Sequence, residues 1–117
     1  MGVSFIQALV NTGINANILE EHVDMSNYAA IIDVRTPSET SAGHIEGALL
    51  FDIYDETFMG QLSTLDKSAN YYLYCRSGSR SGQAIDIMQQ EGFTGMLDNG
   101  GTLENAASET GLTVVRR

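Results

Sequence analysis

The sequence contains a single cysteine, Cys75, so no disulfide bond can form within the chain. A chain without disulfides suits a reducing compartment, and we expect a cytoplasmic protein. One cysteine and two histidines without ligand spacing give no case for a metal site. No apolar run approaches the ~18 residues of a membrane-spanning helix. We therefore expect no metal, no cofactor and no membrane partner.

Basic residues are also few: six lysines and arginines stand against fifteen aspartates and glutamates, giving a formal net charge of −9. Binding to nucleic acid needs a basic surface, so we expect no nucleic-acid partner. A small anion is not excluded, because two of the six cations, Arg76 and Arg80, flank Cys75. Salt screens exposed charges beyond ~8 Å, so these local groups should outweigh the distant carboxylates.

The length of 117 residues fits one domain, residues 1–117, in which residues 1–13 are expected to form an N-terminal helical extension. Apolar runs and helical patterns alternate along the rest of the chain. Expected strands cover residues 29–34, 48–51, 71–74 and 92–97, and expected helices cover residues 16–23, 56–62, 83–90 and 102–109. Gly92 should end the helix over residues 83–90. Pro37, the only proline, marks a loop. The alternation predicts an α/β fold with a largely parallel sheet, whose ligand should lie at the carboxyl ends of the strands.

Cys75 lies where an apolar strand gives way to a short polar loop and then to a helix. The residues that follow it are Arg76, Ser77, Gly78, Ser79, Arg80 and Ser81. The free N–H groups of a helix N-terminus and two nearby arginines favour a thiolate over a thiol, and the thiolate is the nucleophilic form. A free cysteine is commonly an inert buried residue, but a structural cysteine gains nothing from such a loop. We therefore interpret Cys75 as the catalytic nucleophile and residues 76–81 as the loop that binds its substrate and whatever group the sulfur carries.

Three segments of the chain, taken together, resemble the rhodanese family of sulfurtransferases. They are Cys75–Ser81, then Ile31–Glu39 with Gly43–Ala48, and finally Leu97–Gly101, and they occur in the family's order along the chain. The resemblance runs from just after Gly13 to the C-terminus. It implies a rhodanese-like three-layer domain, with a mainly parallel sheet flanked by helices on both faces. It also implies sulfur transfer through a persulfide on Cys75.

Outside the loop, the resemblance implies a supporting role for Asp33, Arg35, Glu39, His44, Gly100 and Gly101. The carboxylates are candidates for general-base catalysis, but an ion-pair network that fixes the loop after a strand is the better interpretation. Within that network we expect Arg35 to pair with Glu39. His44 should support a turn and not activate the thiol. The paired glycines form a turn that we expect to approach the Cys75 loop.

The chain departs from the family at one place, because it contains no tryptophan. Many rhodanese domains carry a tryptophan shortly after the paired glycines, where this chain has Glu104 and Asn105. The departure leaves open how the last helix covers the active-site side.

Two other classes of function fit a cysteine in such a loop. Cysteine-dependent phosphatases and arsenate reductases of related fold are one alternative. However, the phosphatase signature has a histidine before the cysteine and a longer spacing to its arginine, whereas here Tyr74 precedes Cys75 and Ser81 stands at that arginine's position. The shorter loop is sized for a sulfur atom bound to the thiolate and not for a tetrahedral phosphate, which favours sulfur transfer over phosphate hydrolysis. A non-enzymatic module that carries sulfur for a partner protein, or merely binds one, is the second alternative.

The expected reaction takes the outer sulfur of thiosulfate, or of a similar small anionic donor, onto Cys75. A thiophilic acceptor, either cyanide or a cellular thiol, then removes it, and a sulfur-relay protein is a further candidate partner. Arg76 should meet the anionic donor, and Arg80 should fix the loop or share that task. The hydroxyls of Ser77 and Ser79 are expected to be extra donors to the persulfide.

Overall fold

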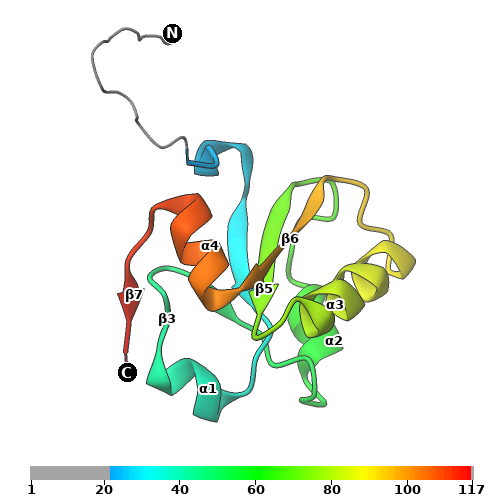
Figure 1. Ribbon diagram of the computed structural model, residues 1–117. Coiled ribbons are helices and arrows are strands. Elements are labelled where there is room, and N and C mark those ends of the chain that lie inside the picture. The colour runs from blue at the N-terminus through cyan, green and yellow to red at the C-terminus, as the bar shows by residue number, and fades with distance from the viewer. Residues whose placement is uncertain (1–21, 117) are drawn as a thin grey trace, which may run out of the picture.

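A sheet of four parallel strands forms the centre of the computed structural model, which describes residues 22–116 (Figure 1). In order across the sheet, the strands are β4 (Leu49–Leu50), β2 (Ala30–Asp33), β5 (Tyr71–Cys75) and β6 (Leu97–Thr102). The two inner strands, β2 and β5, are almost entirely buried. Inner strands of a parallel sheet are covered on both faces, which explains why they are apolar runs without alternation.

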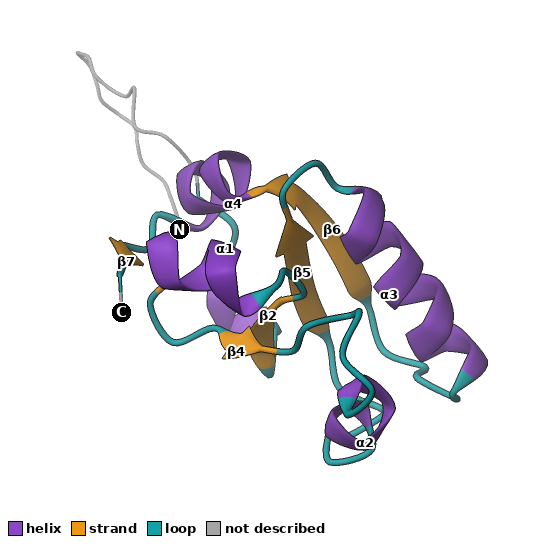
Figure 2. Cartoon of the chain, turned by 90° about the horizontal axis from the view of Figure 1, so that it is seen from below, coloured by secondary structure: helices purple, strands orange, loops and turns teal. Residues whose placement is uncertain are grey.

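Helices cover both faces of this sheet, as Figure 2 shows. On one face, α2 (Phe58–Leu62) and α3 (Ser79–Gln90) bury apolar side chains against β2 and β5. On the other face, α4 (Leu103–Thr110) packs against β5 together with β3 (His44–Ile45). The predicted α/β fold, a mainly parallel sheet between two helical layers, is confirmed.

Successive side chains of β5 point to opposite faces of the sheet. Tyr71, Leu73 and Cys75 join the apolar cluster beneath α2 and α3. Tyr72 and Tyr74 join the cluster beneath α4. Cys75 therefore lies at the carboxyl end of an inner strand, on the face that is covered by the helix following it in the chain.

One helix is not indicated by the sequence, and another begins earlier than expected. Pro37 does not mark a loop but opens helix α1 (Pro37–Ala42), because proline is well tolerated at the first position of a helix. The carboxylate of Glu39 stabilises this start by accepting the N–H of Thr36 at 3.1 Å. Helix α3 begins at Ser79 and not at residue 83, so its first turn includes part of the polar loop.

The expected strand over residues 92–97 is wrong, since β6 covers Leu97–Thr102. Gly92 does end the preceding helix as expected, with a φ of +94°. Asparagine and glycine have little intrinsic preference for strands, so the segment Asp98–Gly101 forms one only because β5 pairs with it.

The other expected elements at residues 48–51, 56–62 and 102–109 correspond to β4, α2 and α4. Four short elements have no counterpart among the predictions: the 3₁₀ turn Met25–Asn27, α1, β3, and β7 (Val114–Val115), which pairs with β3 in antiparallel orientation. The predicted N-terminal extension lies outside the described residues, as does most of the helix expected over residues 16–23.

Between residues 22 and 116, every helix is too short or too polar to reach across a lipid bilayer.

Gly95, in the loop before β6, lies against the backbone of Ala69. A Cβ atom at Gly95 would be 2.0 Å from the carbonyl oxygen of Ala69, and backbone cannot turn aside as a side chain does. Gly95→Ala should therefore lower the free energy of unfolding, measured by urea denaturation, by at least about 2 kcal/mol.

Gly60→Ala is the matched control for this variant. Gly60 lies within α2, and no atom from another part of the fold is within 4 Å of the place that a Cβ atom would occupy. Alanine should therefore be tolerated there and should favour the helix by up to about 1 kcal/mol. Equal stability of the two variants would show that the chain does not approach itself closely at Gly95.

Candidate active site

Cys75 is the last residue of β5, and its side chain has no exposed area (0%). Only three residues separate it from the start of α3 at Ser79. Its sulfur therefore lies close to the first turn of that helix, where backbone N–H groups have no partner within the helix.

Two of these N–H groups point at the sulfur. The N–H of Gly78 donates to Cys75 Sγ at 3.0 Å, and the N–H of Ser81 donates at 3.4 Å. The hydroxyl of Ser81 also lies 3.4 Å from the sulfur. The turn depends on glycine, because Gly78 has a φ of +95°, a conformation that strains any other residue.

These contacts decide the acidity of the thiol. Burial raises the pKa of Cys75, but hydrogen bonds from the Ser81 hydroxyl and from the N–H groups of Ser81, Ser77 and Gly78 act against it, and the pKa is lowered overall. This is the direction that the predicted preference for a thiolate requires. Hydrogen bonds lead the lowering, and the two arginines of the loop are not among its main causes.

The expected hydroxyl donors are not the ones that approach the sulfur. The hydroxyl of Ser77 accepts the N–H of Ser79 at 3.3 Å. Among the described residues, the hydroxyl in contact with Cys75 Sγ belongs to Ser81. It lies on the buried side of α3, whereas Ser77 and Ser79 are more open to solvent.

Strand β6 holds this loop through Asn99. The Ser81 hydroxyl lies 2.7 Å from Asn99 Oδ1, and Asn99 Nδ2 donates to the carbonyl oxygen of Gly78 at 2.9 Å. The N–H of Gly101 donates to the same Oδ1 at 2.9 Å. The predicted approach of the paired glycines to the Cys75 loop is confirmed, but the two glycines lie within β6 and not in a turn. The sequence marks Asn99 only as a turn residue, and nothing in the pattern indicates that its side chain links the two segments.

Gly100, the next residue of β6, supports this arrangement by its lack of a side chain. A Cβ atom there would lie 2.4 Å from the ring of Tyr72, so the ring packs directly on the backbone.

The ion pairs differ from the expected one, because Arg35 does not pair with Glu39. Arg35 binds Asp33 instead, with Nη2 2.8 Å from Oδ2, and also donates to the carbonyl oxygen of Gly43 at 2.6 Å. Arg35 and Asp33 are both buried at the end of β2, whereas the carboxylate of Glu39 faces α3. An ion-pair network around this turn is thus present, with different partners.

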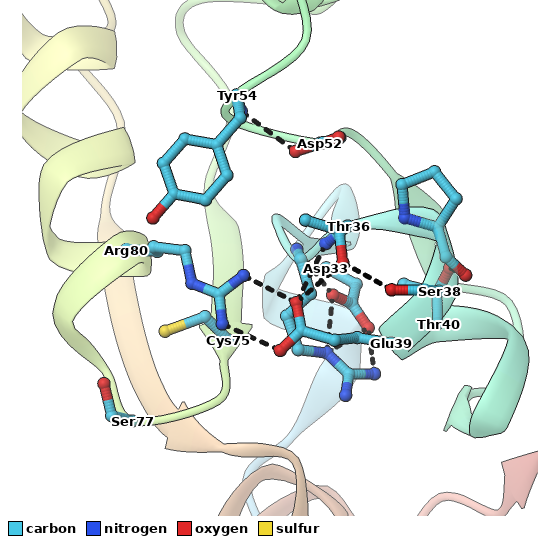
Figure 3. A network of polar contacts seen from close by, with 12 residues as sticks. Asp33, Thr36, Ser38, Glu39, Thr40, Asp52, Tyr54, Cys75, Ser77 and Arg80 are labelled. Carbon is cyan, nitrogen blue, oxygen red and sulfur yellow. Dashed lines mark hydrogen bonds and ion pairs between the residues drawn. The ribbon is translucent and has the colours of Figure 1, made fainter.

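Glu39 binds Arg80 through two hydrogen bonds, of 2.7 and 2.9 Å (Figure 3). The pair joins α1 to the first turn of α3. Arg80 also places its guanidinium carbon 5.7 Å from the ring centre of Tyr54. Of the two tasks expected of Arg80, the geometry favours fixing the loop.

The same pair changes the acidity of Glu39. Its hydrogen bond to Arg80, opposed in part by burial and aided by Thr36, lowers the pKa of Glu39 to about 2. The pKa of Arg80 is raised by the same hydrogen bond. Both groups therefore stay charged at neutral pH.

His44 occupies a structural position, as predicted. It is buried, and its Nδ1 lies 3.0 Å from the carbonyl oxygen of Thr40. Within residues 22–116, no cysteine–histidine hydrogen bond and no group of three metal-ligating side chains is found.

A pocket of about 250 Å³ lies beside the loop, because Arg76, which follows Cys75, forms part of its wall. The lining residues are Arg35, Glu39, Ala42, Arg76, Leu103 and Glu104. The first turn of α4 thus covers this side with a leucine and a glutamate, in the neighbourhood where the sequence lacks a tryptophan.

The chain is similar to known sulfurtransferases in sequence and in fold. A family model described as the Rhodanese-like domain matches residues 15–105. A sulfurtransferase of Allochromatium vinosum is 30% identical over 103 residues, which cover 87% of this chain and 92% of that protein. Thiosulfate sulfurtransferase PspE of Escherichia coli is 32% identical over 76 residues, covering 65% of this chain and 72% of that protein. A solved structure of a rhodanese with anions from E. coli matches with a TM-score of 0.61 and 29% identity, covering 75% of this chain and 98% of that one.

The pairing of Glu39 with Arg80 predicts a pH-dependent contribution to stability. The folded-state pKa of about 2 lies below the usual value for glutamate, so the pair stabilises the fold above the unfolded-state pKa and loses its effect as the pH falls towards 2. Glu39→Gln should lower the free energy of unfolding by about 1–3 kcal/mol at neutral pH, and the gap to the wild type should narrow as the pH falls below about 5. Urea denaturation at several pH values measures this gap.

Glu46→Gln serves as the control, because Glu46 is exposed and the change removes the same charge without touching Arg80. If the free energies of unfolding of the wild type and of Glu39→Gln change in parallel with pH, the ion pair does not lower the pKa of Glu39.

The contact with Ser81 predicts that its hydroxyl lowers the pKa of Cys75. Ser81→Ala should raise the pKa of the thiol, because the variant removes a donor to the thiolate and keeps the backbone N–H in place. Ultraviolet absorbance of the thiolate, followed as a function of pH, measures the change. Ser79→Ala removes an exposed hydroxyl from the same helical turn and should leave the thiol pKa unchanged. The same pKa in both variants would rule out a donor role for the Ser81 hydroxyl.

Proposed function

The chain belongs to the family of Rhodanese-like domains, and we propose that it transfers a sulfane sulfur from thiosulfate, or a similar small anion, to a thiophilic acceptor through a persulfide on Cys75. Relatives of the chain are sulfurtransferases, which supports the general reaction. The observation that carries the proposal is the pair of N–H groups, from Gly78 and Ser81, that point at Cys75 Sγ.

In the first step, the Cys75 thiolate attacks the outer sulfur of thiosulfate. A new S–S bond forms at Cys75, the S–S bond of thiosulfate breaks, and sulfite leaves with the electron pair. In the second step, cyanide or a thiolate attacks the outer sulfur of the persulfide, and the electron pair of the breaking bond returns to Cys75. The two steps balance without an external oxidant or reductant.

The residues of the loop have separate tasks in this scheme. N–H groups at the start of α3 stabilise the negative charge on the thiolate and on the persulfide. Arg76 is exposed on the wall of the pocket and attracts the anionic donor. Because the thiol has no exposed area, residues around it must shift to admit the outer sulfur of the donor.

The same geometry speaks against a phosphatase. In the phosphatase signature the loop ends in an arginine that binds the phosphoryl oxygens, but Arg80, the arginine near the end of this loop, has both branches of its guanidinium bound to Glu39. The next position, Ser81, is buried against the sulfur. A sulfur carrier without turnover would form the same persulfide, and only its failure to pass sulfur to a small acceptor would set it apart.

Cys75→Ser tests the proposal, because the chain has no second thiol to replace it. After incubation with thiosulfate, the intact mass of the wild type should increase by one sulfur atom, and that of Cys75→Ser should not. Formation of thiocyanate from thiosulfate and cyanide should disappear in the variant, because an alcohol is a far poorer nucleophile at neutral pH.

Circular dichroism confirms that Cys75→Ser is folded before the two proteins are compared. Thiocyanate formation at the wild-type rate in the folded variant would contradict the role of Cys75. Hydrolysis of an aryl phosphate by the wild type, without any gain of sulfur, would favour the phosphatase instead. Loading with sulfur but no thiocyanate would favour the carrier.

A further inference from the structure

Two of the four charged residues in the wall of the pocket are already paired inside the protein. Arg35 is buried and binds Asp33 at 2.8 Å. Glu39 binds Arg80 at 2.7 Å. A ligand that enters the pocket therefore finds these two charges largely neutralised.

The other two charges are Arg76 and Glu104, which are both exposed. Within the part of the chain that the structure describes, neither forms an ion pair. The pocket therefore offers a ligand one available cation and one available carboxylate. Arg76 accounts for attraction of the anionic donor, whereas Glu104 repels such a donor and needs a different explanation.

A contribution to the stability of α4 explains only in part why a glutamate stands at position 104. It lies in the first turn of α4, where a carboxylate has a favourable interaction with the helix dipole of about 0.3–1 kcal/mol. The helix is already capped, because the side chain of Thr102 accepts the N–H of Asn105 at 2.9 Å. The capping role is thus filled by another residue, and the carboxylate of Glu104 contributes to the wall of the pocket.

We propose that Glu104 selects the acceptor, by attracting the ammonium group of a small aminothiol to the persulfide of Cys75. The inference rests on the sulfurtransferase function proposed above. A pocket of about 250 Å³ is small for a ligand site, which fits an acceptor of a few heavy atoms. The thiolate of the acceptor attacks the outer sulfur, an S–S bond forms on the acceptor, and the bond to Cys75 breaks with return of the electron pair to Cys75. The ammonium group takes no part in the bond changes and only positions the thiol.

Rapid-mixing kinetics with the persulfide form of the full chain test this inference. Cysteamine carries an ammonium group, mercaptoethanol carries no charge, and their rates are compared per thiolate to remove the difference in thiol acidity. Glu104→Gln should lower the ratio of the cysteamine rate to the mercaptoethanol rate by about three- to ten-fold, as expected for the loss of one partly screened ion pair. The mercaptoethanol rate itself should stay the same, and added salt should narrow the difference between the proteins.

Glu91→Gln is the matched control. It removes the same charge from an exposed residue just after α3, one helix length of about 18 Å from the loop. The inference would be overturned if Glu104→Gln kept the wild-type ratio of the cysteamine rate to the mercaptoethanol rate, or if Glu91→Gln lowered that ratio by the same factor. Either result would leave the sulfurtransferase function intact. Absence of the persulfide after treatment with thiosulfate, seen in the intact mass, would overturn both.

Discussion

Hydrogen bonds from the first turn of α3 to the sulfur of Cys75 are the interaction on which the rest of the site depends. Cys75 has no exposed area, and burial alone would raise the pKa of its thiol and keep it uncharged. The N–H group of Gly78, at 3.0 Å, and the contacts with Ser81 reverse that effect. The sheet therefore shields the sulfur from water, and the helix supplies the donors that water would otherwise provide.

The loop can act in this way only because two other parts of the fold hold it. Glu39 on α1 binds Arg80, a residue 41 positions away in the chain, and so joins α1 to the start of α3. Asn99, within β6, binds both Ser81 and Gly78. Its Oδ1 also accepts the N–H of Gly101. The contacts of Glu39 with Arg80 and of Asn99 with Ser81 hold the loop in place around the thiol, whereas most of the net charge of −9 lies farther away.

The sequence predicts those features that depend on neighbouring residues. The buried strand before Cys75, the glycine that ends α3 and the helix after the paired glycines follow from local patterns, and each lies close to its expected place. Local patterns fail where distant segments decide the structure. The segment of β6 is poor in strand-forming residues and becomes a strand because β5 pairs with it. The partner of Glu39 cannot be predicted from local patterns either. Spacing along the chain suggests Arg35, and only the packing of α1 against α3 brings Arg80 to Glu39.

The central claim, that hydrogen-bond donors make a buried thiol more acidic, is tested most directly by alkylation of Cys75 with iodoacetamide over a range of pH. The reagent is uncharged, and the chain has one thiol, so the rate reports on the ionisation of that residue alone. If the donors prevail over burial, the rate profile has its midpoint below about pH 8.5, the pKa of an ordinary free thiol. A midpoint at or above that value would mean that burial outweighs the donors of α3, and the claim would be contradicted.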